Sequence, residues 1–237
     1  MPISIKHGIM HKGKEGGTLA LTWAVFDIIG TIAFALSGAI VGLSKKMDIF
    51  GVIVLSVLTA VGGGIIRDIL VGVIPPSALM NTTNLLLAVA TAIIVSVVYG
   101  SFQIAPEHKT RFLFVYYFSD TLGLAAFTIT GVIMGLAQKD AFFTLPVLLG
   151  LLTAVGGGVL RDLLAQQMPT VLYADVYAVA AVAGAFVVCV AAKYHADMQI
   201  ASWLGFLTVA VLRFLALRYH WQIYHPRPVK KNIKPQS

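Results

Sequence analysis

The chain has 237 residues, of which 58% are hydrophobic and 11% charged, and its mean hydropathy is +0.88. Soluble domains carry roughly 25% charged residues, so this composition excludes an ordinary soluble domain. The net charge of +7 comes mainly from basic residues in the two tails and the short loops, which argues against nucleic-acid binding, and the single cysteine, Cys189, excludes an intrachain disulfide.

Apolar runs long enough to cross a bilayer recur along nearly the whole chain, which predicts an all-α integral membrane protein. We expect seven transmembrane helices, at residues 22–43, 49–71, 82–102, 112–137, 141–165, 173–193 and 201–219. Residues 1–21 then form an extracytoplasmic N-terminal tail, and residues 220–237 form a basic cytoplasmic tail that contacts lipid headgroups. The polar cluster that begins the third run, from Asn81 to Asn84, predicts helix capping.

Loop charges predict how the chain is oriented. With seven spans the two tails lie on opposite sides of the membrane. Nine lysine and arginine residues fall on the C-terminal side and five on the other. Because short cytoplasmic loops carry an excess of lysine and arginine, this bias predicts a cytoplasmic C-terminus and an N-terminus outside.

One ten-residue motif occurs twice. Thr59-Ala-Val-Gly-Gly-Gly-Ile-Ile-Arg-Asp68 returns as Thr153-Ala-Val-Gly-Gly-Gly-Val-Leu-Arg-Asp162, with two conservative changes. The similarity extends upstream, because the segment that begins at Asp27 matches the segment that begins at Asp120 at a constant offset of 93 residues. The sequence therefore contains an internal duplication.

The duplicated unit has three spans, which fixes the relation between the copies. Residues 22–102 form the first copy, residues 112–193 the second, and the helix at 201–219 lies outside the repeat. Because each unit crosses the membrane an odd number of times, the second must enter from the opposite face. Such inverted repeats are typical of transport proteins, in which the pathway lies between the two halves.

Each copy of the motif places three adjacent glycines near the middle of an apolar run, at the expense of about 1 kcal/mol of helix propensity per glycine relative to alanine. The residues are Gly62, Gly63 and Gly64 in the second run and Gly156, Gly157 and Gly158 in the fifth. One interpretation is a kinked, broken helix whose freed carbonyls line a polar path. The other is close packing against a neighbouring helix.

Each motif also carries a charge pair. Thr59, Gly63 and Arg67 share one helix face, as do the equivalent residues Thr153, Gly157 and Arg161. An arginine at bilayer depth costs at least about 2.5 kcal/mol.

The carboxylates that neutralise these arginines are expected to lie on other spans. Asp68 and Asp162 point about 100° away from the adjacent arginine on an ideal helix, so Asp27 and Asp120 are the candidate partners. Two alternatives remain open: a structural ion pair that holds the halves in register, or a charged constriction that sets selectivity or gating.

The remaining patterns are less specific. Glycines four residues apart predict helix packing in the first and fourth spans; they are Gly38, Gly42, Gly131 and Gly135. The six histidines fall in tails or at span ends, so we expect no metal site. Neither H-E-x-x-H, G-x-S-x-G nor a phosphate-binding loop occurs, and we expect the chain not to be an enzyme.

The doubled GGG-x-x-RD motif, in a chain built from three, three and one spans, resembles the prokaryotic trimeric intracellular cation (TRIC) channels, a family that also carries a glycine-transporter label. The resemblance covers about residues 22–219. It implies a homotrimer in a bacterial or archaeal inner membrane, with one K⁺-permeable pore per subunit between kinked second and fifth helices. It implies no cofactor beyond the permeant ion and bound lipid.

A cation pore with arginines at its waist repels its own cargo unless those charges are neutralised. Either carboxylates hold Arg67 and Arg161, or the arginines form a closed gate. A third option is a pathway for a zwitterion such as glycine, whose carboxylate an arginine binds. A K⁺ channel is therefore our leading hypothesis and a small amino-acid transporter the alternative, with lipid and further copies of the chain as partners.

Overall fold

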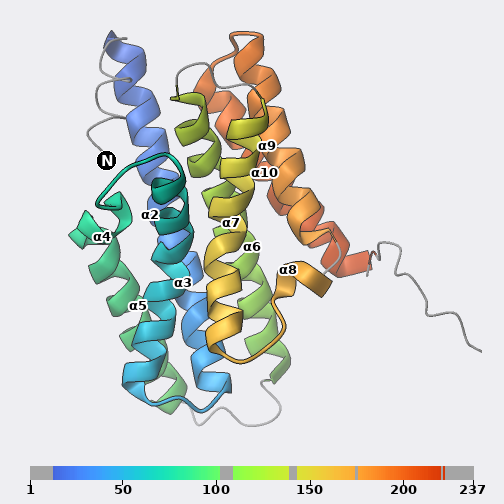
Figure 1. Cartoon of the computed structure of the whole chain (residues 1–237). Helices are drawn as coiled ribbons and strands as arrows, with labels where there is room; N and C mark the ends of the chain where they lie inside the picture. The colour runs from blue at the N-terminus through green and yellow to red at the C-terminus, as the bar shows by residue number, and fades with distance from the viewer. Residues whose placement is uncertain (1–12, 102–108, 139–142, 174–175, 220, 222–237) are drawn as a thin grey trace, which may run out of the picture.

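The computed structural model of the chain describes residues 13–101, 109–138, 143–173, 176–219 and 221, and all regular secondary structure in this part is helical (Figure 1). The helices are α2 (Gly13–Ser44), α3 (Ile49–Leu70), α4 (Ser77–Met80), α5 (Thr82–Ser101), α6 (Lys109–Leu136), α7 (Thr144–Leu164), α8 (Thr170–Tyr173), α9 (Tyr177–Lys193) and α10 (Met198–Tyr219). Most of both predicted tails, residues 1–12 and 222–237, lies outside the described residues. Because α2 begins at Gly13, the helix includes the end of the segment assigned to the N-terminal tail.

The all-helical membrane fold predicted from composition is confirmed. Within the described residues, six helices are long and apolar enough to cross a bilayer: α2, α3, α5, α6, α7 and α10. The helix α9, at the position of the predicted sixth span, is apolar but has only 17 residues. At 1.5 Å per residue it is about 26 Å long, slightly less than the ~30 Å hydrocarbon core.

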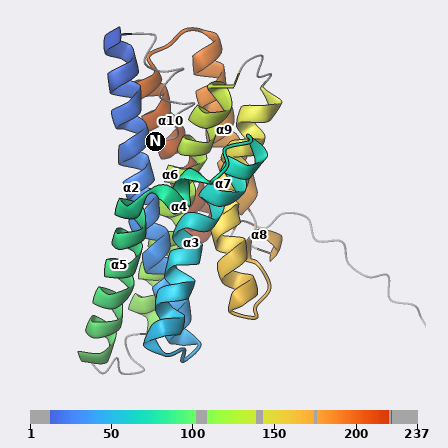
Figure 2. The same cartoon turned by 60° about the vertical axis from the view of Figure 1, so that its left-hand side comes forward.

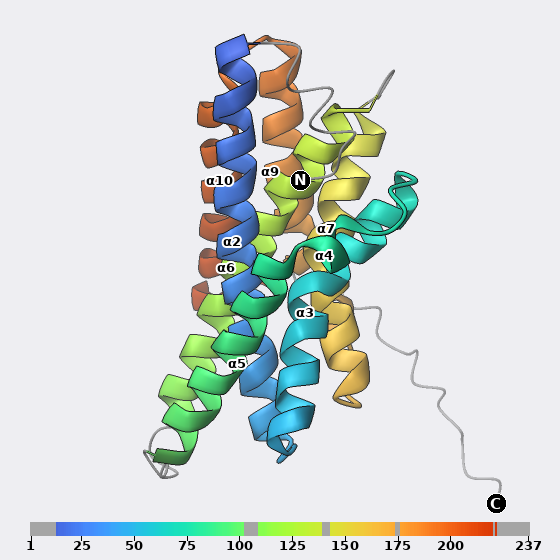
Figure 3. The same ribbon diagram turned by 90° about the vertical axis from the view of Figure 1, so that its left-hand side faces the viewer.

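The two three-helix units run in opposite directions. In Figure 1, α2 and α5 run downward and α3 upward, whereas α6 and α9 run upward and α7 downward. Each unit has a short helix after its second long helix, α4 in the first and α8 in the second. Helix α2 packs against α6 and α3 against α7, whereas α10 packs mainly against α9 and α6 of the second unit (Figures 2 and 3).

The first helices of the two units meet through a reciprocal contact. The ring of Phe127 lies against Gly30, and the ring of Phe34 lies against the equivalent residue, Gly123. The two rings pack edge to face, with centroids 5.2 Å apart. A methyl group on either glycine would overlap the opposing ring, so the sequence match at an offset of 93 residues is also a symmetry of the core.

Candidate functional site

Helices α3 and α7 cross at their glycine triplets. A methyl group on Gly63 would lie 2.1 Å from the carbonyl oxygen of Thr153, and one on Gly157 would lie 2.1 Å from the carbonyl oxygen of Thr59. No carbon atom fits at that distance, so only glycine permits this approach. On either side of the crossing, Gly62 lies against Leu160 of α7. A methyl group on Gly64, Gly156 or Gly158 would also lie close to the side chain of another residue.

The triplets do not interrupt their helices. The α-helix continues through Gly62–Gly64 and through Gly156–Gly158, and all six glycines are buried. Neither helix therefore has a break that would free its carbonyl groups. The predicted bends at the glycine triplets stay a prediction. Nor do the neighbouring threonines extend a polar path, because the hydroxyls of Thr59 and Thr153 donate to carbonyl oxygens four residues earlier in their own helices.

The spaced glycines of the first and fourth spans lie between the first and second helices of their units. A methyl group on any of them would lie 3.2 Å or less from an atom of the next long helix. The contacts are Gly38 with Ser56, Gly42 with Val52, Gly131 with Leu149 and Gly135 with Pro146. Each unit therefore packs its first two helices through the same glycine spacing.

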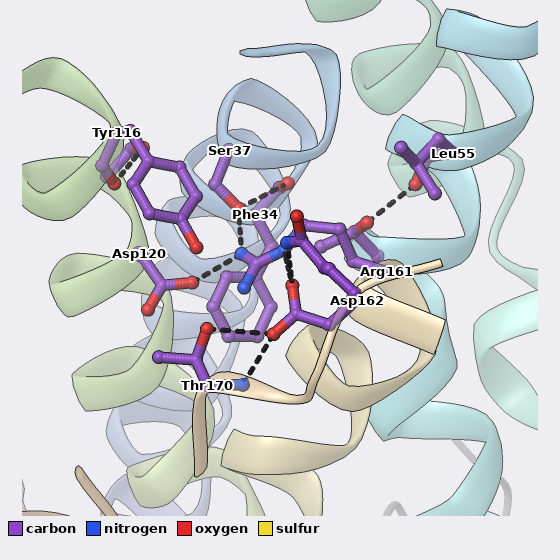
Figure 4. Close-up of polar contacts among 11 residues, drawn as sticks. Phe34, Ser37, Leu55, Tyr116, Asp120, Arg161, Asp162 and Thr170 are labelled. Carbon is purple, nitrogen blue, oxygen red and sulfur yellow. Dashed lines mark hydrogen bonds and ion pairs between the residues drawn. The ribbon is translucent and has the colours of Figure 1, made fainter. Parts of the chain in front are cut away.

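Arg161 forms the centre of a buried charge cluster in the second unit (Figure 4). Its guanidinium forms an ion pair with Asp120 of α6, donates from Nε to Asp162 Oδ1 at 2.8 Å and donates from Nη1 to the hydroxyl of Ser37 in α2 at 2.8 Å. The ring of Tyr116 lies 5.1 Å from the guanidinium carbon. The cluster therefore ties α7 to α6 of its own unit and to α2 of the other.

Arg67 occupies the equivalent position in the first unit but has a different set of partners. Its Nε and Nη2 atoms both lie 2.9 Å from Asp68 Oδ1, and the ring of Trp23 lies 5.8 Å from its guanidinium carbon. The carboxylate of Asp27 accepts a hydrogen bond from the amide of Asn84 and forms no ion pair with Arg67. The expected pairing across spans is thus present in the second unit and absent from the first.

The aspartate after each arginine anchors the short helix that follows. Asp68 Oδ2 accepts from the backbone N–H of Ser77 at 2.7 Å and from its hydroxyl, so it holds the start of α4. Asp162 Oδ2 accepts from the backbone N–H of Thr170 at 2.7 Å and from its hydroxyl at 2.8 Å, so it holds the start of α8. Each carboxylate therefore bonds its neighbouring arginine through one oxygen and a helix start through the other, a role that the ideal-helix geometry did not predict.

Several partners of the charge clusters were missed by the sequence reasoning. Trp23 and Tyr116, which stack on the arginines, are themselves equivalent at the offset of 93 residues, so extending the repeat alignment upstream would have found them. Asn84 was interpreted as a capping residue, but its side-chain amide contacts Asp27.

A third buried arginine lies in α10. Arg213 stacks its guanidinium over the ring of Tyr177 at 4.6 Å, and its Nε has no hydrogen-bond partner among the described residues. The hydroxyl of Tyr177 is likewise buried without a partner in this part of the chain. A cation well inside the last apolar run was the signal that would have identified Arg213.

A small polar cavity opens beside Asp27 and Arg67 in the first unit. About 20 Å³ of it is open to the centres of water-sized molecules, which is enough for one or two of them. Oxygen-bearing side chains in its wall come from Asp27, Thr31, Ser77, Asn81 and Asn84. Among the described residues, no cluster of three or more histidine, cysteine or acidic side chains has the arrangement of a metal site.

Comparisons with known proteins identify the family. A family model described as glycine transporter matches the chain twice, over residues 24–100 and 117–193. A UPF0126 membrane protein of Deinococcus radiodurans is 40% identical over 207 residues, which are 85% of this chain and 90% of that protein. The UPF0126 inner membrane protein YadS of Escherichia coli K12 is 34% identical over 198 residues, which are 83% of this chain and 92% of that protein.

Solved structures decide how this family is to be named. A structure that shows the basis for conductance through TRIC cation channels has a TM-score of 0.76 and 35% identity, and the match covers 86% of this chain and 97% of that one. The chain belongs to the TRIC family. The TRIC orthologue from Rhodobacter sphaeroides has a TM-score of 0.75 and 30% identity, with 84% of this chain and 98% of that one covered. The two matches of the family model coincide with the two inverted units, and both family and fold are of the channel and transporter type.

Proposed function

We propose that this chain is a cation channel that passes monovalent cations, chiefly K⁺, through one pore in each subunit of a homotrimer. The pore runs between the inverted units and is lined by α3 and α7, which we expect to bend at their glycine triplets. The similarity to solved TRIC cation channels, at 30% to 35% identity over most of the chain, supports this proposal.

The state of the arginines is the observation that carries the cation proposal. Free arginines at the waist of a pore would repel cations. Here Arg161 has carboxylate partners in Asp120 and Asp162, and Arg67 has one in Asp68. Because paired charges largely cancel each other's field at a distance, the electrostatic objection to cation passage is removed.

The glycine-transporter alternative is favoured by the description of the family model. It requires an arginine that is free to bind the carboxylate of the substrate. Both arginines of the repeated motif already bind an aspartate carboxylate, so a substrate carboxylate would have to displace a buried ion pair. At the repeated motif, the geometry therefore favours the channel over the carrier.

Membrane orientation is part of the same proposal. The relatives include an inner membrane protein, and the described helices form a multi-pass bundle. We place the N-terminus outside and the C-terminus in the cytoplasm of a prokaryotic inner membrane, on the basis of the lysine and arginine bias.

Reconstitution of the purified protein tests the proposed activity. In planar bilayers bathed in KCl, the channel proposal predicts discrete unitary current steps. In proteoliposomes, the carrier alternative predicts saturable uptake of labelled glycine. Saturable glycine uptake without unitary currents would contradict the channel and establish the carrier.

A further inference from the structure

The two units have diverged at the positions around the small cavity. Asn84 lies in the first unit where the second has Tyr177, and Thr31 lies where the second has Leu124, at the same offset of 93 residues. Burial supports this equivalence, because Asn84, Ala88 and Ala92 face the core of α5, as do the equivalent residues of α9. Larger and more apolar side chains thus occupy the place in the second unit where the first has a polar cavity.

The buried arginines and aspartates also differ between the two units. Three arginines and four aspartates are buried in the described part of the chain. In the second unit, Arg161 is shared by two aspartates, and Arg213 of α10, which lies outside the repeat, stacks against Tyr177. In the first unit, Asp68 pairs with Arg67, and Asp27 is the buried aspartate that forms no ion pair among the described residues, although Arg67 lies in the same cavity wall.

A buried carboxylate without a counter-charge is costly unless it is neutralised. Asp27 is only 8% exposed, and the one side-chain contact that the described residues provide is the neutral amide of Asn84. The cavity beside it adds hydroxyl and amide groups to the carboxylate. Carboxylate, hydroxyl and carbonyl oxygens are the ligands that hard cations prefer.

Size and charge decide which ligand suits this cavity. A volume of about 20 Å³ open to water centres fits a monatomic ion or a water molecule. Glycine would also need a cationic partner for its own carboxylate. Arg67, the cation in the cavity wall, already binds Asp68.

We propose that the cavity between α2, α3 and α5 is a binding site for one dehydrated monovalent cation, with Asp27 as its charged ligand. Thr31 and the amide oxygens of Asn81 and Asn84 provide neutral ligands. The site belongs to the first unit alone, so the two units of the repeat have different roles. It deepens the proposed cation channel, on which its physiological use rests, because it places an ion site beside α3.

The experiment measures K⁺ binding by the purified full-length protein through its apparent melting temperature. The protein is heated in KCl and in N-methyl-D-glucamine chloride at equal ionic strength, because the large organic cation does not fit the cavity. We expect K⁺ at several times its Kd to raise the wild-type melting temperature by about 2–4 °C. Asp27→Asn removes the charged ligand and is expected to weaken K⁺ binding at least about tenfold.

Two further variants separate binding from folding. Asn84→Tyr introduces the side chain that the second unit carries at this position, so it fills the cavity and abolishes the K⁺-dependent shift while Asp27 stays in place. Asp120→Asn, at the position equivalent to Asp27, lowers the melting temperature in both salts but keeps the K⁺-dependent shift.

A K⁺-dependent shift that survives both Asp27→Asn and Asn84→Tyr would overturn the proposed site. So would a rise in melting temperature with glycine but not with K⁺, which would identify a zwitterion site. Bilayer recordings on the same samples keep the two proposals apart. If the wild type carries K⁺ currents and Asp27→Asn keeps the full K⁺-dependent shift in melting temperature, the ion site alone is rejected. If that shift depends on Asp27 but the wild type carries no current, the channel alone is rejected.

Discussion

Arg161 and Arg67 occupy equivalent positions but differ in how strongly they are held. Arg161 contacts side chains of α6, α7 and α2, whereas the ion-pair partner of Arg67 in the described part of the chain is the adjacent Asp68. A buried arginine that joins three helices stabilises their relative positions, because each contact is lost when the helices separate. The arginine of the second unit is therefore the more strongly held of the two.

This difference predicts unequal costs for two matched substitutions. Asp120→Asn removes one carboxylate from a buried ion pair, and we expect it to destabilise the protein by about 3 kcal/mol or more. Asp27→Asn replaces a carboxylate that has no ion pair among the described residues, and we expect a loss of about 1 kcal/mol or less when K⁺ is absent. Melting curves in N-methyl-D-glucamine chloride measure both, and equal losses would show that the two aspartates have similar environments.

Sequence reasoning was able to select the charged residues but not all of their partners. The repeated motif identified both arginines, and Asp27 and Asp120 were predicted as candidate partners without either being assigned to one arginine. The structure pairs Asp120 with Arg161 and shows no ion pair for Asp27. The reason is that Asn84 holds Asp27 from α5, and which helix presents an amide to a carboxylate depends on packing that no spacing along the chain encodes.

Helix α3 and helix α7 form the central element of the fold. Their crossing at Gly63 and Gly157 brings the backbone of one unit against that of the other, and each arginine lies one turn beyond the crossing glycine. The order of the predicted spans was recognisable because long apolar runs mark membrane helices, and six helices among the described residues are long enough to cross a bilayer. The sequence could not decide the role of the glycines, because a break in a helix and a close crossing of two helices both require glycine.

The crossing predicts a specific sensitivity to small substitutions. Gly63→Ala or Gly157→Ala places a methyl group against a carbonyl oxygen of the opposing helix and forces α3 and α7 apart. We expect a loss of about 1–3 kcal/mol in thermal stability for each. Gly100→Ala in α5 is the matched control, because nothing lies within 4 Å of its added methyl group and alanine favours the helix. An unchanged melting temperature in both crossing variants would refute the close contact.

At the scale of the whole molecule, two similar units lie in opposite directions and enclose buried charges. Arg67 and Arg161 are paired with aspartates, whereas Asp27 and Arg213 form no ion pair among the described residues. The inversion followed from the sequence alone, because three spans per unit leave no other arrangement. The divergence between the units did not, since it depends on which buried side chains fill the volume around each arginine. The molecule thus combines one unit whose buried arginine contacts three helices with one unit that contains a small cavity beside a buried aspartate.

The most direct test of the central claim, that carboxylates neutralise the arginines along a cation pathway, is the reversal potential of wild-type channels in a planar bilayer. The recording uses a KCl gradient across the membrane. Neutralised arginines predict a reversal potential close to the equilibrium potential of K⁺. A reversal potential close to that of Cl⁻ would show that the arginines act as free positive charges, and it would contradict the account.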